Sequence, residues 1–165
     1  MINELLRQRL AEIRLAAFDV DGVFTDGRFY LSDDGVESKA FSTQDGYGVR
    51  RLLQCGIDVA VISGRKSPAV ERRMSELGVK HVFLGCSNKA EVYDTLLRDL
   101  GLTPGQTAYT GDDFPDLPLL QKAGVSFAVA NAHADIRRIC DMTTKASGGH
   151  GAVREICDLL AEVAG

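Results

Sequence analysis

The sequence lacks any apolar run long enough to cross a bilayer, and its first residues lack the pattern of a signal peptide. It also lacks a basic excess, because the formal net charge is -4 and the pI is about 5.4. A protein that binds nucleic acid would usually carry a basic face. We therefore expect a cytoplasmic protein that binds neither membranes nor nucleic acids.

Clustered soft-metal ligands are lacking as well. The four cysteines form no C-x-x-C pair, and the three histidines are equally dispersed. A zinc site needs several such ligands close together, so we expect none. In a chain without a secretion signal, the cysteines are expected to be reduced thiols. The residues concerned are Cys55, Cys86, Cys140, Cys157, His81, His133 and His150.

What the chain does contain is the composition of one compact domain. It has 165 residues, of which 45% are hydrophobic and 25% charged, and we expect a single domain over residues 1–165. Residues 1–13 are predicted to form an amphipathic helix, whose apolar side would carry Ile2, Leu5, Leu6, Leu10 and Ile13.

From residue 57 onward, short apolar runs alternate with helical patterns. This alternation predicts an α/β fold, a Rossmann-like three-layer sandwich with a mainly parallel sheet. Before it, aromatic and β-branched residues on both sides of Ser32-Asp33-Asp34-Gly35 predict a β-hairpin over 27–41. The predicted strands are 15–18, 57–62, 80–83, 106–110 and 125–130. The predicted helices are 45–54, 68–77, 89–99, one that holds Leu117, Leu119 and Leu120, and a last one after the loop 147–151.

Polar residues follow several of these strands, at the edge where parallel sheets bind ligands. Asp19 and Asp21 follow the first strand, and Ser63 follows the second in the sheet. Lys89 lies in the first turn of a helix, where a positive charge opposes the helix dipole. The acidic group after strand 106–110 is Asp112, Asp113 and Asp116. Asp21-Gly22 alone is equally typical of a turn. The whole set, however, suits phosphoryl transfer on Mg²⁺.

These residues also carry a resemblance. Asp19 to Val23, Ile62 to Arg65, Lys89 and Gly111 to Asp116 resemble, in order, the motifs of the haloacid dehalogenase superfamily. The resemblance implies that Asp19 is the nucleophile and Asp21 the general acid/base. It further implies Mg²⁺ bound by Asp19, the Asp21 main-chain carbonyl and Asp112. Ser63 and Lys89 would bind the phosphoryl oxygens. Asp116, or Asp113, would order the waters of the metal or Lys89.

Within that superfamily, segments 19–27, 43–48, 87–89 and 148–155 resemble the 3-deoxy-D-manno-octulosonate 8-phosphate phosphatases. The resemblance implies a sugar-acid phosphate as substrate and lipopolysaccharide precursor synthesis as the role. His150 departs from the family, which has an arginine there. The substrate contacts implied by the match are Asp21, Thr43, Gln44, Asp45, Gly46, Arg50, Arg65, Arg73 and Lys89.

The spacing of these motifs leaves no room for a cap domain. The hairpin and one helix fill the chain between Asp21 and Gly64, and one helix and one strand fill that between Ser63 and Lys89. Phosphoryl transfer benefits from the exclusion of water, so another element must cover the site. The resemblance implies a homotetramer in which the hairpin comes from a neighbouring subunit. Alternatively, the hairpin simply faces solvent.

The same residues are also compatible with two other functions. A phosphatase of a nine-carbon sugar acid, of the sialic acid type, would share the same motifs. Receiver domains of signalling systems also place acidic residues, a hydroxyl and a lysine around Mg²⁺. In those domains the acidic pair follows the first strand and the acceptor aspartate a later one, which is the reverse of the order here.

Overall fold

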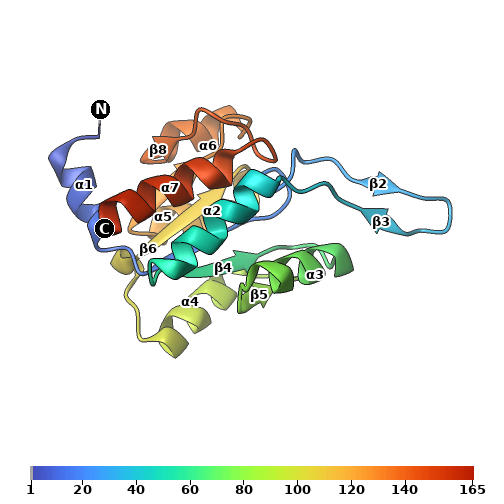
Figure 1. Ribbon diagram of the computed structural model, residues 1–165, viewed down its shortest axis with the longest axis horizontal. Helices are drawn as coiled ribbons and strands as arrows, with labels where there is room; N and C mark the ends of the chain where they lie inside the picture. The colour runs from blue at the N-terminus through green and yellow to red at the C-terminus, as the bar shows by residue number, and fades with distance from the viewer. Residues whose placement is uncertain (1) are drawn as a thin grey trace.

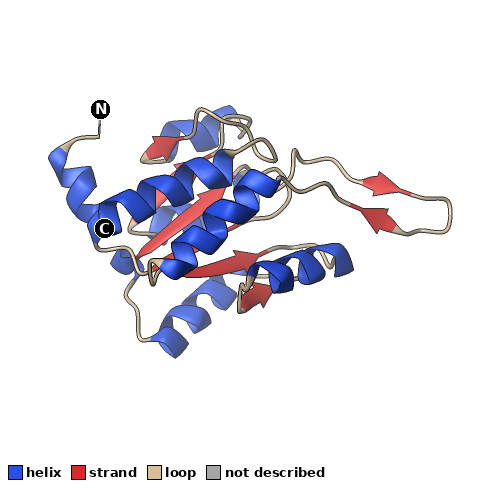
Figure 2. Ribbon diagram, in the orientation of Figure 1, coloured by secondary structure: helices blue, strands red, loops and turns tan. Residues whose placement is uncertain are grey.

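The computed structural model describes residues 2–165, and its centre is a six-stranded sheet. The strand order is β5-β4-β1-β6-β7-β8, and every neighbouring pair is parallel (Figures 1 and 2). The predicted parallel sheet is therefore confirmed. The strands are β1 Leu15–Phe18, β4 Asp58–Ile62, β5 His81–Phe83, β6 Thr107–Gly111, β7 Val125–Ala128 and β8 Met142–Thr143.

Helices cover both faces of this sheet and complete the predicted three-layer sandwich. Helices α2 and α7 pack side by side on one face with α3 beside them, and α4 and α5 pack together on the other (Figure 1). The helices are α1 Glu4–Ala11, α2 Thr43–Gln54, α3 Pro68–Leu77, α4 Lys89–Leu100, α5 Leu117–Lys122, α6 Ala134–Ile139 and α7 Ala152–Ala164, with 3₁₀ turns η1 Pro104–Gln106 and η2 Phe114–Asp116. Among residues 2–165, no helix has the length and apolar character needed to cross a membrane.

Helices α3 and α4 lie close to the predicted ranges 68–77 and 89–99. The Ser67 side chain accepts a hydrogen bond from the main chain of Val70, Pro68 is the first helical residue, and Gly78 ends α3 with a φ of 82°. Asn88 caps α4 in the same way, by accepting from the main chain of Glu91. This cap makes Lys89 the first residue of α4, at the edge of the sheet where the strands end.

Other boundaries differ from the prediction. Helix α1 spans Glu4–Ala11 rather than 1–13, and Met1 lies outside the described residues. Asn3 accepts a hydrogen bond from the main chain of Leu6 and so starts the helix late. Leu5 does not lie on the buried side, because it is 67% exposed. Helix α2 begins at Thr43, two residues before the predicted start, because Ser42 caps it.

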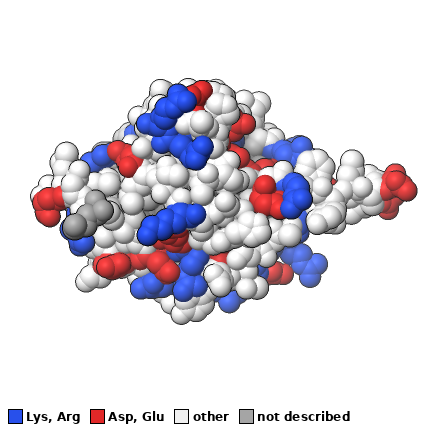
Figure 3. Space-filling view, turned by 90° about the horizontal axis from the view of Figure 1, so that it is seen from above, with Lys and Arg blue, Asp and Glu red and all other residues white. Residues whose placement is uncertain are grey.

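The predicted hairpin is present and projects far from the sheet, at the right of Figure 1. Its strands are short, β2 Tyr30–Leu31 and β3 Glu37–Ser38, and they pair antiparallel. Apolar side chains along it are exposed, and acidic ones lie at its far end (Figure 3). Within residues 2–165, the chain between β1 and β4 holds only this hairpin and α2, and that between β4 and α4 only α3 and β5. No cap domain is inserted at either place, as predicted.

Candidate active site

The predicted polar residues converge at the carboxyl edge of the sheet. Phe18 at the end of β1 is paired with Val61 of β4 and Thr110 of β6, so these three strands end at the same level. Asp19 continues from β1 and donates its main-chain N–H to the Thr110 carbonyl at 3.0 Å. The side chains that follow each strand are thereby brought to one edge.

Lys89 connects two of these carboxylates. Its Nζ lies 3.0 Å from Asp19 Oδ1 and 2.9 Å from Asp116 Oδ1, and the side chain is 9% exposed. Asp116 also accepts from the Tyr109 hydroxyl at 2.8 Å and from the main chain of Asp112 at 3.1 Å. Both oxygens of Asp116 are therefore in use, and its role is to hold Lys89 and the start of the Asp112 loop.

Asp113 has a different position from Asp116, although the sequence allowed either to support the site. Its side chain is exposed and accepts from the main chain of Phe114 at 2.8 Å. Asp113 thus caps the turn η2, whose last residue is the buried Asp116. The 3₁₀ turn places one acid inward and leaves the other at the surface.

Burial and mutual repulsion raise the pKa of the clustered acids. Burial, followed by the charge of Asp116, raises the pKa of Asp19 well above its ordinary value. The same two causes raise the pKa of Asp112 to about 6. Burial disfavours the charged form of Lys89, but the charges of Asp19 and Asp116 raise its pKa. One ammonium thus faces three carboxylates, and the cluster carries excess negative charge.

A hard divalent cation fits this cluster. Oxygen atoms of Asp19, Asp112 and Asp116 all lie within 4.8 Å of one another, and carboxylate oxygens are what Mg²⁺ prefers. Both carboxylate oxygens of Asp116 are already hydrogen-bonded, whereas Lys89 contacts only Oδ1 of Asp19. Asp19 and Asp112 are therefore the side chains with an oxygen left to bind a cation. The Asp112 carboxylate can lie this close to the loop after β1 because residue 22 is a glycine, with φ of 85°. A Cβ at Gly22 would lie 2.0 Å from Asp112 Oδ2. A side chain at this position would displace Asp112.

Ser63 directly follows β4 at the same edge. It is 2% exposed, and its hydroxyl accepts from the main chain of Arg65 at 3.3 Å. Its own main-chain N–H donates to the carbonyl of Phe83, at the end of β5. The hydroxyl is thus held in a turn at the end of the strand, as the sequence predicted.

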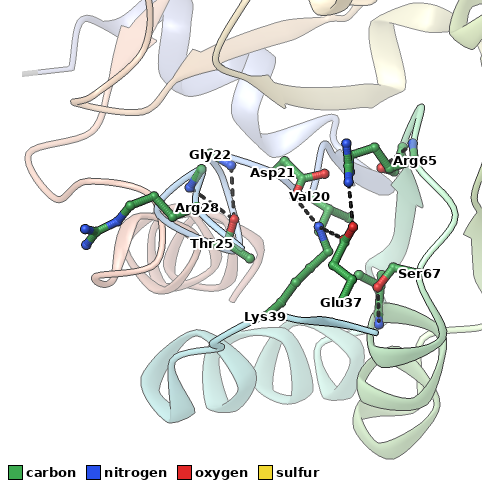
Figure 4. A network of polar contacts seen from close by, with 12 residues as sticks. Val20, Asp21, Gly22, Thr25, Arg28, Glu37, Lys39, Arg65 and Ser67 are labelled. Atoms are coloured by element: carbon green, nitrogen blue, oxygen red, sulfur yellow. Dashed lines mark hydrogen bonds and ion pairs between the residues drawn. The ribbon is translucent and has the colours of Figure 1, made fainter. Parts of the chain in front are cut away.

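The acid/base candidate Asp21 contacts the hairpin, which sequence reasoning missed. Lys39 Nζ is hydrogen-bonded to Asp21 Oδ1 and lies 3.1 Å from Glu37 Oε1 (Figure 4). The other oxygen of Glu37 accepts from Arg65 at 2.5 Å. A signal for these contacts was present in the sequence, because Glu37 and Lys39 lie two residues apart in the predicted hairpin, and residues two apart in a strand point to the same face.

Among the predicted arginines, only Arg65 reaches this edge, where its guanidinium lies 4.4 Å from the centre of the Phe29 ring. Arg50 donates to the carbonyl of Glu76, near the far end of α3. Arg73 lies 3.5 Å from the Glu76 carboxylate and packs against Gly46. Arg50 and Arg73 therefore lie on the surface formed by α2 and α3, where both contact Glu76.

The predicted contact segment at the start of α2 is only partly open. Thr43 and Gln44 are exposed, but Asp45 is 1% exposed and accepts from the main chain of Arg154 at 2.9 Å. Burial raises the pKa of Asp45. Its side chain joins α2 to the first turn of α7, and the ligand contact expected of it stays a prediction.

Asn131, which was not predicted from the sequence, connects the loop after β1 to the loop 147–151. Asn131 donates to the Gly22 carbonyl at 3.4 Å and accepts from the main chain of Gly148 at 2.7 Å. The neighbouring Gly149 donates to the Val23 carbonyl. The loop 147–151 therefore packs directly on the loop that carries Asp21, with His150 in the same segment.

Asp19 follows β1, and Lys89, the first residue of α4 after β5, contacts it. Together with the acids that follow β6, at the same edge of a parallel α/β sheet, they define a haloacid dehalogenase-like hydrolase. Residues 85–156 match that family. The 3-deoxy-D-manno-octulosonate 8-phosphate phosphatase of Escherichia coli K12 is 47% identical over 83% of this chain and 73% of its own. The chain belongs to the family of 3-deoxy-D-manno-octulosonate 8-phosphate phosphatases.

Solved structures agree with this assignment. The phosphatase of the same name from Yersinia pestis matches with a TM-score of 0.96 and 44% identity, over 99% of this chain and 88% of that one. The one from Moraxella catarrhalis matches with a TM-score of 0.95 and 40% identity, over 99% and 93%. The latter was solved in complex with a magnesium ion, a phosphate ion and a KDO molecule.

Proposed function

We propose that this protein is a Mg²⁺-dependent phosphatase that hydrolyses 3-deoxy-D-manno-octulosonate 8-phosphate to the free sugar acid and phosphate. The observation that carries the proposal is the position of Asp19. It lies at the end of the central strand, in contact with Lys89 and beside Asp112, in a chain 47% identical to phosphatases of that name. The protein would act in the synthesis of lipopolysaccharide precursors. The receiver-like alternative does not fit membership of this family.

The residues suit hydrolysis in two steps. Asp19 attacks the phosphorus and forms an aspartyl-phosphate, while Asp21 gives a proton to the departing sugar oxygen. Asp21 then takes a proton from the water that attacks the phosphorus and releases Asp19. Lys89 and Ser63 bind the phosphoryl oxygens throughout. When bound, Mg²⁺ offsets the charge of the phosphoryl group, and Asp19, Asp112 and the Asp21 main-chain carbonyl would hold it.

Arg65 is the best-placed residue to recognise the substrate carboxylate. Guanidinium groups pair with carboxylates through two parallel hydrogen bonds. In this structure one side of Arg65 already holds a carboxylate, that of Glu37, and nearly half of its side chain is exposed. A sugar acid entering from that exposed side would meet Arg65 at the rim of the Asp19 site.

We further propose that the single-domain subunits form a cytoplasmic homotetramer in which the hairpin of one subunit covers the site of another. Tyr30, Leu31 and Val36 support this, because they are 74%, 65% and 58% exposed on an extended arm. The position of Arg50 and Arg73 on the surface formed by α2 and α3 also supports it. These arginines would then line the entrance to a neighbour's site.

Phosphate release in the presence of Mg²⁺ tests the activity. The substrates are the eight-carbon acid phosphate, a nine-carbon acid phosphate and a hexose phosphate, each with wild type and Asp19→Asn. We expect preference for the eight-carbon acid and no turnover by Asp19→Asn. Faster turnover of the hexose phosphate would contradict the substrate class, and an active Asp19→Asn would contradict the nucleophile.

Subunit mixing tests the assembly. One variant carries Asp19→Asn with an intact hairpin, and the other carries serine at Tyr30, Leu31 and Val36 with intact chemistry. If the hairpin covers a neighbour's site, mixed oligomers regain activity that neither variant has alone. A wild type that is monomeric by light scattering at assay concentration would rule the shared site out.

A further inference from the structure

The base of the hairpin carries a buried lysine in contact with the acid/base candidate. The side chain of Lys39 is 0% exposed, although it belongs to an arm that is otherwise largely open to solvent. Its Nζ is hydrogen-bonded to Asp21 Oδ1 and paired with Glu37 at 3.1 Å (Figure 4). The same Nζ lies 5.7 Å from the centre of the Phe29 ring.

A buried ammonium needs a compensating partner, because its transfer from water is costly. Glu37 and Phe29 already provide an anion and an aromatic face, and both belong to the hairpin. The Arg65–Glu37 pair independently ties the hairpin to the loop after β4. The hairpin is therefore anchored without the contact between Lys39 and Asp21. The consequence of that contact is for the orientation of Asp21.

Asp21 depends on this contact for its orientation. Its side chain is 25% exposed and follows the strand in a loop. Among residues 2–165, no other side chain or main-chain group is hydrogen-bonded to its carboxylate. Without Lys39, the carboxylate could turn about its side-chain bonds. A proton donor must be held within hydrogen-bond reach of the atom that it protonates, and a small misplacement lowers the reaction rate strongly.

We propose that Lys39 is a positioning residue that holds Asp21 in the orientation for proton transfer, with Glu37 holding Lys39 in turn. Lys39 binds Oδ1 and leaves Oδ2 for the transferred proton. That proton passes from Oδ2 to the sugar oxygen as the phosphorus–oxygen bond breaks, and the attacking water returns one to Oδ2. Lys39 keeps its own protons throughout. The inference rests on the proposed function, since it assigns Asp21 to proton transfer.

The leaving group provides the test. A sugar alkoxide departs poorly without a proton, whereas p-nitrophenolate departs readily without one. We expect Lys39→Met to lower kcat for the sugar-acid phosphate about 10- to 100-fold, part of the usual contribution of general acid catalysis, with KM within about twofold. For p-nitrophenyl phosphate, kcat/KM should stay within about threefold of wild type. Lys39→Arg, which keeps the charge, should recover most of the loss.

Two controls make the comparison specific. Asp21→Asn should show the same dependence on the leaving group. Lys122→Met should behave as wild type, because Lys122 also pairs with a carboxylate, Asp94, but lies away from the site. Both substrates are assayed on one preparation, so the ratio of the two rates does not depend on the fraction of folded protein.

Equal losses on both substrates, a change confined to KM, or no loss at all would overturn the proposal. The first result would indicate general damage to the site, and the second a direct contact with the sugar. If the proposed function itself is wrong, the result differs from these, because wild type would then not hydrolyse the eight-carbon acid phosphate. The Lys39 comparison would still be made with a hexose phosphate that wild type hydrolyses.

Discussion

Replacement of Asp112 by asparagine should stabilise the metal-free protein at neutral pH, even though it removes a proposed metal ligand. Burial, with the nearby charge of Asp116, raises the pKa of Asp112 from 3.8 to about 6. The charged carboxylate is therefore less favourable in the folded chain than in the unfolded one. Asparagine has nearly the same shape and carries no charge, so it removes this penalty.

The shift in the pKa of Asp112 determines how much stability the Asp112→Asn variant should gain. A change from 3.8 to about 6 corresponds to about 3 kcal/mol, at about 1.4 kcal/mol for each pKa unit. Asp112 is only partly buried, and water screens such a group, so we expect about 1–2 kcal/mol. In a domain of this size that gain raises Tm by about 2–8 °C. Because the folded pKa is the raised one, the penalty is full above pH 6 and fades as the pH falls toward 3.8.

Thermal unfolding followed by circular dichroism measures the gain. In EDTA at pH 7.5, Asp112→Asn should melt above wild type, and the difference should shrink at pH 4.5. Added Mg²⁺ should raise the Tm of wild type but not that of the variant, because a ligand stabilises only the state that binds it. Asp113→Asn is the matched control, since Asp113 is exposed and asparagine also caps a turn.

A variant no more stable than wild type in EDTA at pH 7.5 would refute this reasoning. So would a gain that stays undiminished at acid pH, because it would then have a cause other than the charge of Asp112.

Three smaller changes should act on the same site. Gly22→Ala should weaken Mg²⁺ binding at least tenfold by calorimetry, because a Cβ would lie 2.0 Å from Asp112 Oδ2; unchanged affinity would contradict the close approach. Tyr109→Phe should lower the free energy of unfolding in urea by about 1–2 kcal/mol, because Asp116 loses a hydrogen bond of 2.8 Å. Asn131→Ala should speed hydrogen exchange in loops 22–25 and 147–151 by mass spectrometry, and unaltered exchange would show that Asn131 does not hold them together.

Much of the fold and of the catalytic centre was predictable from the sequence. Parallel strands all end at one edge, so residues that follow them in the chain lie at that edge, as Asp19, Ser63 and Asp112 do. Lys89 begins the helix after β5 and contacts Asp19 there. Local signals such as the Asn88 cap depend on neighbouring residues and were equally accessible. The start of α1 was missed because an apolar pattern over residues 1–13 does not reveal where capping begins a helix.

The order of the elements, the parallel sheet and the acids at its edge therefore follow from the amino-acid sequence alone. Three features depend on the folded chain: Asp116 rather than Asp113 holds Lys89, Asp45 is buried against α7, and Lys39 reaches Asp21. The reason is physical. Strand ends are brought together by the regular geometry of a sheet, whereas the direction of a turn, the packing of two helices and the course of a hairpin depend on contacts between residues far apart in the chain.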